Sequence, residues 1–509
     1  MASWTAGYVA DLDYTQGFYR ELTPALLAFV AMAHAQAAPD VSGPLTYCEL
    51  GCGRGFSANL LAAANPHIAF HANDFNPGHI VGARRLARAA GSDNIQFYDH
   101  SFAEFLDAPE VPDFDIIALH GIYSWISAEN RAVIIEFLRR KLRPGGLVYV
   151  SYNCQPGWSL AAPLRHLMAL HGQARGGPTA GRIEPALDFI QSLVDVNAGY
   201  FRGQPGLVDR LAKLKGQPRN YLAHEYMNDD WTLFYHSDVA HEMSEAKLTF
   251  LASAHVLDSI DNITVTPEQG RLLAGIESSA FRETVRDYMI GQQFRRDVFV
   301  RGPLLQTSGD VAAAWDQMRV ALTSAREDVP EKITVAQGDV ALDPAVYGPI
   351  LDALETGLKT CREVMDAVGT PPGGAAHLRQ VIAILIGAGH VQPCLPSPPD
   401  ETRVRRAEAF NAAVLNQARA HGELQALVSP VIGGGVSLNR FQQLFLLALR
   451  EGERDPSAFV GAILEAQGQS LVKDGQPLVT SAENQAELKI RYEQFVARDL
   501  PVLERLGIA

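Results

Sequence analysis

The sequence predicts an α/β fold, with a parallel sheet in the N-terminal half followed by largely helical regions. Between residues 47 and 153, short apolar runs alternate with helical patterns, which is typical of βαβ units. From about residue 156 the pattern changes to helices broken by Gly- and Pro-rich stretches. At 509 residues the chain is too long for one hydrophobic core, and its length suggests about three domains.

The sheet region contains five clear strand signals and two weaker ones. The clear strands are expected at Thr46–Leu50, Ile68–Asn73, Asn94–Tyr98, Phe114–Leu119 and Leu147–Tyr152. Helices are expected from Ser57 to Ala64 and from Ala128 to Leu142. Apolar runs at Leu248–Ala254 and Asp297–Arg301 are candidates for a sixth and a seventh strand. If both form, the α/β domain closes near residue 302.

These patterns divide the chain into four predicted regions. They are a helical cap at 1–45, the sheet domain at 46–302 with a helical insertion at about 156–235, a winged-helix-like middle domain at 305–395, and a C-terminal helical domain at 400–509. The middle domain lacks the basic surface that a DNA reader needs. A packing or dimerisation module is therefore the favoured interpretation.

Composition excludes several classes of function. The 57 acidic and 43 basic residues give a net charge of −14, which argues against nucleic acid as a partner. The five cysteines are scattered without Cys-x-x-Cys spacing, so we expect no disulfide framework, no metal site and a reducing, cytoplasmic location. No apolar run approaches the roughly 20 residues that a membrane span needs.

A glycine-rich loop follows the first predicted strand. Glu49 ends an apolar run, and Gly51, Gly53 and Gly55 follow at alternate positions. Glycines at this spacing let the chain turn sharply and bring bare backbone against a ligand. The loop lacks the third glycine of a dinucleotide fingerprint and the Lys of a P-loop. An acid ahead of it suits a cationic or amine-bearing ligand. The combination resembles motif I of class I S-adenosylmethionine-dependent methyltransferases, which have a Rossmann-like sheet.

Residues at the ends of the next two strands are candidates for binding a nucleoside. Asp74 lies 21 residues after Gly53, where a carboxylate can accept the ribose hydroxyls. The alternative is a helix N-cap, since Asn76 and Pro77 follow. Ser101 and Phe102 would place a backbone N–H and an aromatic face beside an adenine ring. Asp99 is a second candidate there.

Polar and aromatic residues also follow the fourth and fifth strands. Residues 120–125 read His-Gly-Ile-Tyr-Ser-Trp, and residues 149–158 read Tyr-Val-Ser-Tyr-Asn-Cys-Gln-Pro-Gly-Trp. Because ligands gather beyond strand C-termini in such sheets, these two segments predict a pocket. They look like the bacterial methyltransferases that carry a methyltransferase regulatory domain, among them rickettsial protein-lysine methyltransferases that modify outer-membrane proteins. Segments 14–21 and 221–235 extend the resemblance, which covers most of the chain.

The resemblance implies a cofactor, a set of residues around it and a homodimer. The cofactor is S-adenosyl-L-methionine, and the product is S-adenosyl-L-homocysteine. Tyr14, Tyr19 and Arg20 would lie on an N-terminal helix that closes over the cofactor. The residues implied to surround it are Glu49, Gly51, Gly53, Asp74, Ser101, Phe102 and His120.

Methylation of an amine needs a neutral nucleophile about 3 Å from the methyl carbon. A lysine with an ordinary pKa of about 10.4 must therefore be desolvated or deprotonated. Candidates for deprotonating or orienting it are His120, His224 and Glu225. Aromatic side chains desolvate an amine and attract the methylated cation. Candidates for this aromatic wall are Tyr123, Trp125, Tyr152, Tyr226 and Trp231.

Three functions remain open from the sequence. The first is methylation of protein lysine side chains. The second is N- or O-methylation of a small molecule on the same fold. The third is a cofactor-binding scaffold without turnover, whose C-terminal helices serve a partner.

Overall fold

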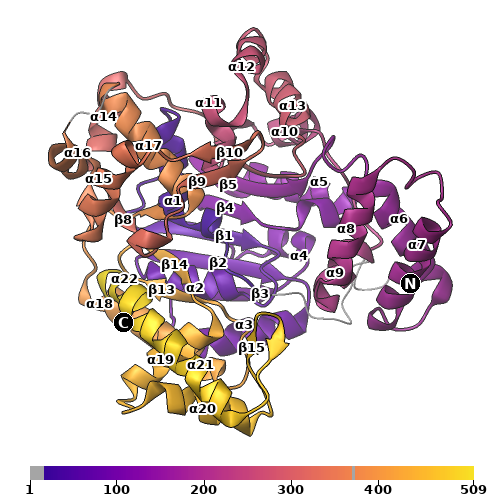
Figure 1. The fold of residues 1–509 in the computed structure, drawn as a ribbon. Coiled ribbons are helices and arrows are strands. Elements are labelled where there is room, and N and C mark those ends of the chain that lie inside the picture. The colour runs from indigo at the N-terminus through magenta and orange to yellow at the C-terminus, as the bar shows by residue number, and fades with distance from the viewer. Residues whose placement is uncertain (1–15, 370–372) are drawn as a thin grey trace.

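The computed structural model describes residues 16–369 and 373–509 and is built around a seven-stranded sheet (Figure 1). The strands are β1 Leu45–Leu50, β2 Ile68–Asp74, β3 Ile95–Asp99, β4 Phe114–Leu119, β5 Leu142–Asn153, β6 Leu248–Ser253 and β7 Phe294–Arg301. Their order is β3-β2-β1-β4-β5-β7-β6. The predicted α/β fold, including both weaker strands, is confirmed.

The sheet is mixed, whereas the sequence predicted a parallel one. Strands β1 to β5 are parallel, but β7 runs antiparallel to both β5 and β6. Strand β5 also begins five residues before the predicted Leu147, because the chain stays extended through the Pro144-Gly145-Gly146 segment. The five parallel strands direct their carboxyl ends to one edge, where the glycine loop and the polar-aromatic segments meet.

Helices cover both faces of the sheet. One face packs on α1 Pro24–Ala33 and α2 Phe56–Ala64, and the neighbouring α3 Pro77–Ala89 packs on β2 and β3. The other face packs on α4 Phe102–Asp107, α5 Ala128–Lys141 and α10 His236–Glu245. The central strands are therefore buried on both sides, which explains why they appear in the sequence as continuous apolar runs.

The predicted helical insertion lies between β5 and α10. Its helices are α6 Ala162–Arg175, α7 Ala180–Asp195, α8 Pro205–Lys215 and α9 Arg219–Tyr226. Leu164, Leu187 and Leu222 belong to a hydrophobic cluster separate from the two faces of the sheet. Three helices, α11 Asp261–Thr264, α12 Pro267–Ala274 and α13 Ser279–Ile290, connect β6 to β7.

The middle region combines helices with short strands. Its elements are α14 Ser308–Gln317, β8 Arg319–Leu322, β9 Lys332–Val335, β10 Gly338–Ala341, α15 Pro344–Glu355, β11 Lys359–Thr360, α16 Cys361–Val368, α17 Gly374–Ala388 and β12 Val391–Pro393. Strands β11, β8 and β12 form one small sheet, and β9 and β10 form a hairpin. Strands β8 to β11 were not among the strands expected from the sequence.

The C-terminal region is largely helical but contains two hairpins. Its elements are α18 Glu401–Ala418, β13 Ala426–Ser429, β14 Gly434–Ser437, α19 Arg440–Arg450, α20 Pro456–Ala466, β15 Val472–Lys473, β16 Gln476–Pro477, α21 Ser481–Gln494 and α22 Leu500–Arg505. The run Gly433–Gly435 includes the last residue before β14 and the first two residues of that strand. A Cβ on Gly435 would lie 2.9 Å from Leu60 and from Phe18, so the glycine allows the hairpin to pack closely on α2 and the N-terminal segment.

Figure 1 shows the insertion helices on one side of the sheet and the middle and C-terminal helices on the other. The latter two regions share a continuous hydrophobic core with the sheet domain. The Trp315 ring, for example, lies edge-on to Phe29 at 5.6 Å. The proposed division into domains therefore stays a prediction. Among the described residues, none of the helices combines the length and apolarity that crossing a membrane requires.

Candidate active site

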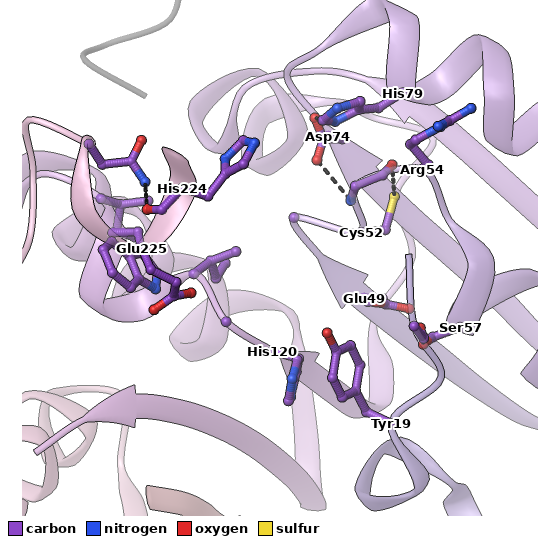
Figure 2. Close-up of a pocket in the computed structure, with 18 of the residues that line it drawn as sticks. Tyr19, Glu49, Cys52, Arg54, Ser57, Asp74, His79, His120, His224 and Glu225 are labelled. Carbon is purple, nitrogen blue, oxygen red and sulfur yellow. Dashed lines mark hydrogen bonds and ion pairs between the residues drawn. The ribbon is translucent and has the colours of Figure 1, made fainter. Parts of the chain in front are cut away.

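A cavity of about 710 Å³ lies at the carboxyl ends of β1 to β4. The glycine loop and Asp74 line one end, and residues of α9 line the other (Figure 2). Tyr19 and His120 lie between these two ends. The sheet edge and the helical insertion thus enclose one continuous space, large enough for a nucleoside cofactor together with part of an acceptor.

The three glycines of the loop have different reasons for being glycine. All three have positive φ, at +68° for Gly51, +55° for Gly53 and +66° for Gly55. A Cβ on Gly51 would lie 2.8 Å from Ile122, and one on Gly55 would lie 2.7 Å from Ala83. A Cβ on Gly53 would meet nothing within 4 Å. The outer two glycines therefore permit close packing, whereas Gly53 leaves bare backbone beside the cavity.

Asp74 connects this loop to the start of α3. Its Oδ2 accepts a hydrogen bond from the Gly53 N–H at 2.9 Å, and its Oδ1 accepts one from the Asn76 N–H at 2.9 Å. The Nδ1 atom of His79 lies 3.2 Å from the same Oδ1. The N-cap of α3 is Asn76, whose side chain accepts from Gly78 N–H. Asp74 therefore organises the turn and still lines the cavity.

Glu49 is buried, and one of its two carboxylate oxygens has no hydrogen-bond partner among the described residues. Its carboxylate lines the cavity, and Oε2 has no hydrogen-bond partner within residues 16–369 and 373–509. Burial, together with the nearby Asp74 carboxylate, raises the pKa of Glu49 from 4.5 to about 8. Because an unpaired buried carboxylate is costly, this position favours a ligand that brings a hydrogen-bond donor or a positive charge.

Three residues at the end of β3 and just after it are candidates for binding the cofactor, and two of them line the cavity. Ser101 and Phe102 line the cavity, whereas Asp99 does not. The Ser101 hydroxyl and the Glu104 side chain form a capping box at the start of α4. Ser101 is therefore held in place, and the preceding His100, which the sequence analysis did not select, also reaches the cavity.

The N-terminal segment crosses the cavity in an extended conformation, not as the predicted helix. Tyr14 lies outside the described residues. Tyr19 precedes a short 3₁₀ turn, Arg20–Leu22, and its ring stacks on His120 with centroids 3.7 Å apart. Arg20 turns away and donates to the carbonyls of Ile386 and Gly387 at 2.6 and 2.5 Å. The prediction that Arg20 faces the cofactor is therefore wrong, because its guanidinium is committed to α17.

His120 is poorly suited to be a general base. Its Nδ1 lies 2.8 Å from the Tyr149 hydroxyl, and the ring is covered by Tyr19. Burial, assisted by the charge of Arg296, lowers the pKa of His120 to about 3. A neutral ring with so low a proton affinity can position neighbours and shape the cavity, but it is a weak proton acceptor at neutral pH.

Besides His120, three of the predicted acceptor residues line the cavity, namely Trp125, His224 and Glu225. The predicted Tyr123 and Tyr152 are instead buried behind it. The Tyr123 hydroxyl donates to Glu242, and the Tyr152 hydroxyl donates to Asp297 at 2.5 Å. Both rings stabilise the sheet and its helices instead of facing an acceptor.

Tyr226 and Trp231 are also absent from the cavity wall. Tyr226 is buried in the core of the insertion. The guanidinium of Arg165 lies 4.6 Å from the centre of the Trp231 ring and 5.8 Å from that of Trp125. The same group donates to the carbonyls of Glu225 at 3.3 Å and Asn228 at 2.6 Å. The face of Trp231 that was predicted to attract a methylated cation is thus occupied by the protein's own arginine.

Several residues that line the cavity were not selected from the sequence. They are His79, Trp158, Arg210, Tyr221, Asn228 and Arg296. Trp158 lies in a segment that the sequence analysis quoted, at the end of the fifth strand. Tyr221 and Asn228 lie in segment 221–235, which also carries part of the family resemblance, whereas no local pattern marks Arg210 in the helical insertion. Among the described residues there is no group of three or more His, Cys, Asp or Glu arranged to hold a metal ion.

Comparison with known proteins agrees with this architecture. A family model for a methyltransferase domain matches residues 48–148, and one for a predicted methyltransferase regulatory domain matches residues 218–301. An uncharacterized protein of Synechocystis sp. is 42% identical over 507 residues, covering 100% of both chains. An uncharacterized protein of Rickettsia prowazekii is 25% identical over 302 residues, covering 58% of this chain and 52% of that protein.

The fold is also similar to a solved structure over nearly the whole chain. PKMT2 from Rickettsia typhi superimposes with a TM-score of 0.70 at 17% identity, covering 97% of this chain and 100% of that one. PKMT2 has also been solved in complex with AdoHcy, the demethylated cofactor. Together with the matched domains and the glycine loop, these findings show that the chain belongs to the class I S-adenosylmethionine-dependent methyltransferases that carry a methyltransferase regulatory domain.

Proposed function

We propose that this methyltransferase transfers its methyl group to lysine side-chain amines of proteins. The observation that carries the proposal is the composition of the cavity end opposite the glycine loop. Glu225 lies at that end (Figure 2), and Trp125, Trp158 and Tyr221 line the same cavity. A lysine combines an apolar stem with a cationic head, so aromatic walls around one carboxylate match it in both respects. The sequence resemblance to protein-lysine methyltransferases supports the same acceptor.

We further propose which residues hold the cofactor. The loop backbone at Gly51 and Gly53 and the Glu49 carboxylate would hold the amino acid part, and Asp74 would hold the ribose. Ser101 and Phe102 would lie beside the base. Two features support this arrangement. The Glu49 Oε2 atom has no hydrogen-bond partner among the described residues and can accept one from a ligand. Gly53 has free space where a side chain would be, so a ligand can approach its backbone. S-adenosylmethionine supplies an electrophilic methyl group.

The protein's own task is then to present a neutral amine. In the transfer, the sulfur–carbon bond breaks as the nitrogen–carbon bond forms, and the amine gives up one proton. The rings of Trp125, Trp158 and Tyr221 exclude water, which lowers the pKa of an amine held among them. Glu225 would orient the ammonium and accept its proton directly or through water. Because two of these tryptophans lie near arginines, we assign charge recognition to the carboxylate and not to an aromatic cage.

The acceptor class is tested with cofactor labelled in its methyl group. The purified enzyme is incubated with host lysate or with a pool of low-molecular-weight metabolites, and the products are separated by size. We expect acid-stable label on protein, found by peptide mass spectrometry as methyl-lysine. Label confined to small molecules would replace this proposal with the alternative of small-molecule N- or O-methylation.

The resemblance also predicts a homodimer, and the cysteine usage predicts a cytoplasmic location. Both stay predictions.

A further inference from the structure

A short segment, which runs without regular structure to Tyr19 and ends in the 3₁₀ turn Arg20–Leu22, connects the active site to the C-terminal half of the chain. This segment, residues 16–22, borders the cavity, and Gln16, Gly17, Tyr19 and Glu21 line it. It precedes α1 and ends 23 positions before the start of β1. We refer to it as the strap. Nothing in the methyl-transfer chemistry described above accounts for how the strap is held.

Within the cavity, the strap contributes one large side chain. The Tyr19 ring stacks on His120, and Figure 2 shows it directed into the space between the glycine loop and α9. Burial and then the charges of Glu225 and Glu49 raise the pKa of Tyr19, so its hydroxyl stays protonated. The residue therefore lies close to both the cofactor end and the acceptor end.

The next residue leads out of the cavity to the middle region. Arg20 donates to the carbonyls of Ile386 and Gly387, which belong to the last turn of α17. The Ile386 carbonyl also accepts from the N–H of the C-cap residue Gly389 at 3.1 Å, and the negative end of the helix dipole lies there. A guanidinium with two donors directed at such a helix end is a strong, directional anchor. The anchor is adjacent in sequence to Tyr19.

The C-terminal region holds the other end of the strap. Gln16 donates to the Glu423 carboxylate at 3.2 Å. Phe18 packs against Gly435 in the β13–β14 turn region, where a Cβ would lie 2.9 Å from its ring. The Ser57 hydroxyl, at the start of α2, donates to the Gly17 carbonyl at 2.9 Å. Three separate parts of the chain therefore fix seven residues that border the active site.

We propose that Arg20 is a positioning residue through which the middle region holds Tyr19 against His120 and so completes the cofactor site. Arg20 touches neither the cavity nor the reacting atoms, and it acts through the residue beside it. The middle and C-terminal regions then have a definite role in the enzyme. They form the outer support of the strap, and the sheet domain alone lacks one wall of its active site. The inference concerns cofactor binding and does not depend on the identity of the acceptor.

The test measures AdoHcy affinity by calorimetry in the full chain. Arg20→Ala removes two hydrogen bonds, and we expect AdoHcy to bind about tenfold more weakly, the effect of roughly 1.4 kcal/mol. Arg20→Lys keeps the charge with a smaller donor group, and we expect it to recover part of the affinity. The matched control is Arg403→Ala, since Arg403 is a buried arginine that donates to the carbonyl of Ser397, away from the strap. We expect the control to bind AdoHcy as the wild type does.

A double-mutant cycle separates positioning from general destabilisation. Tyr19→Leu removes the ring that Arg20 is proposed to hold, so adding Arg20→Ala should then weaken binding by less than threefold. Full additivity of the two effects would overturn the proposal, as would wild-type affinity in Arg20→Ala. If Arg20→Ala does not fold, the same cycle is run with Arg20→Lys. Wild-type AdoHcy affinity in a folded Arg20→Lys that has lost thermal stability would show that Arg20 acts on stability alone.

Discussion

The two ends of the cavity are built in different ways. At the cofactor end, the groups that line the space come largely from one short stretch, Glu49 to His79, and include bare backbone. At the acceptor end, the lining comes from Trp125, Trp158, Arg210 and Tyr221 to Asn228, which lie far apart in the sequence. The first end is fixed by strand termini, and the second by a helical insertion with its own core.

This difference indicates how much sequence change each end of the cavity can tolerate. A site made of backbone and one or two acids depends on the sheet, so it tolerates little change and serves one cofactor. A site made of side chains on a separate helical unit can change its acceptor without disturbing the sheet. Functional residues on such insertions are supported by a rigid scaffold, as in many α/β enzymes. The mutations below test whether the two ends are as independent as their construction suggests.

The largest effect is expected from Asp74→Ala. The substitution removes the carboxylate that holds Gly53 N–H and that we assign to the ribose, so AdoHcy should bind more weakly by about 1–3 kcal/mol, or up to roughly 100-fold. Calorimetry on the purified protein measures this. Asp99→Ala is the matched control, because Asp99 pairs with Asp74 in register on the next strand but does not line the cavity. Equal losses in both variants would contradict the assignment.

A pH dependence is expected from Glu49. Its pKa of about 8 in the ligand-free protein means that the carboxyl is largely neutral at pH 7. A ligand that brings positive charge favours the ionised form, so binding releases a proton below pH 8. AdoHcy affinity should therefore fall as the pH is lowered below about 8, by at most about tenfold per pH unit, until the pH reaches the pKa of Glu49 in the complex. Glu49→Gln should bind AdoHcy more weakly than the wild type at pH 8 and lose this dependence.

The same group makes an opposite prediction for stability. A carboxyl whose pKa is raised on folding destabilises the folded state once the pH exceeds its unfolded value. The stability of the ligand-free wild type should therefore decline between about pH 4.5 and pH 8, and Glu49→Gln should remove this part of the decline. Thermal unfolding across this pH range measures it. A variant that is more stable at pH 8 yet binds AdoHcy less well would mark Glu49 as a functional residue that costs stability.

The sequence predicted the cofactor end well because its signals are local. An apolar strand, alternating glycines and an acid after the next strand all lie within 26 residues, from Glu49 to Asp74, and each has a direct backbone consequence. The unpredicted partner, His79, is on the first turns of α3, where a single histidine carries no pattern. The antiparallel direction of β7 was also not predicted, because the apolar pattern of a strand does not show whether it pairs parallel or antiparallel to its neighbours.

The acceptor end was predicted less well because it depends on tertiary contacts. Tyr123 and Tyr152 lie near strand ends and Trp231 follows α9, and nothing in their spacing distinguishes a cavity wall from a core. Their partners, Glu242, Asp297 and Arg165, lie 119, 145 and 66 residues away in the sequence. The orientation of each ring is set by that distant partner, which a single sequence does not reveal.

A third variant tests the acceptor end alone. Glu225→Gln keeps the size of the side chain and removes its charge, so an amine acceptor should lose a charge-assisted contact. We expect KM for the acceptor to rise by about tenfold, with AdoHcy affinity unchanged within twofold. Steady-state kinetics with the acceptor found by the labelling experiment measures the first, and calorimetry the second. A similar change in AdoHcy affinity would show that the two ends are coupled.

The smallest effect is expected from Arg165→Met. Arg165 lies on α6, is buried, and fixes the carbonyls of Glu225 and Asn228 while its guanidinium lies over Trp231. Methionine fills a similar volume without the hydrogen bonds or the charge, so the end of α9 gains freedom without losing much packing. We expect KM for the acceptor to rise about threefold and AdoHcy affinity to stay unchanged.

The control for this variant is Arg182→Met. Arg182 belongs to the same insertion and donates to the Gly177 carbonyl at 2.6 Å, but it is not among the residues that line the cavity. Its substitution should leave both constants at their wild-type values. If Arg165→Met instead weakens AdoHcy binding as much as it raises KM, the insertion also supports the cofactor end. The acceptor could then not change without affecting the sheet edge, and the independence argued from the construction of the two ends would be lost.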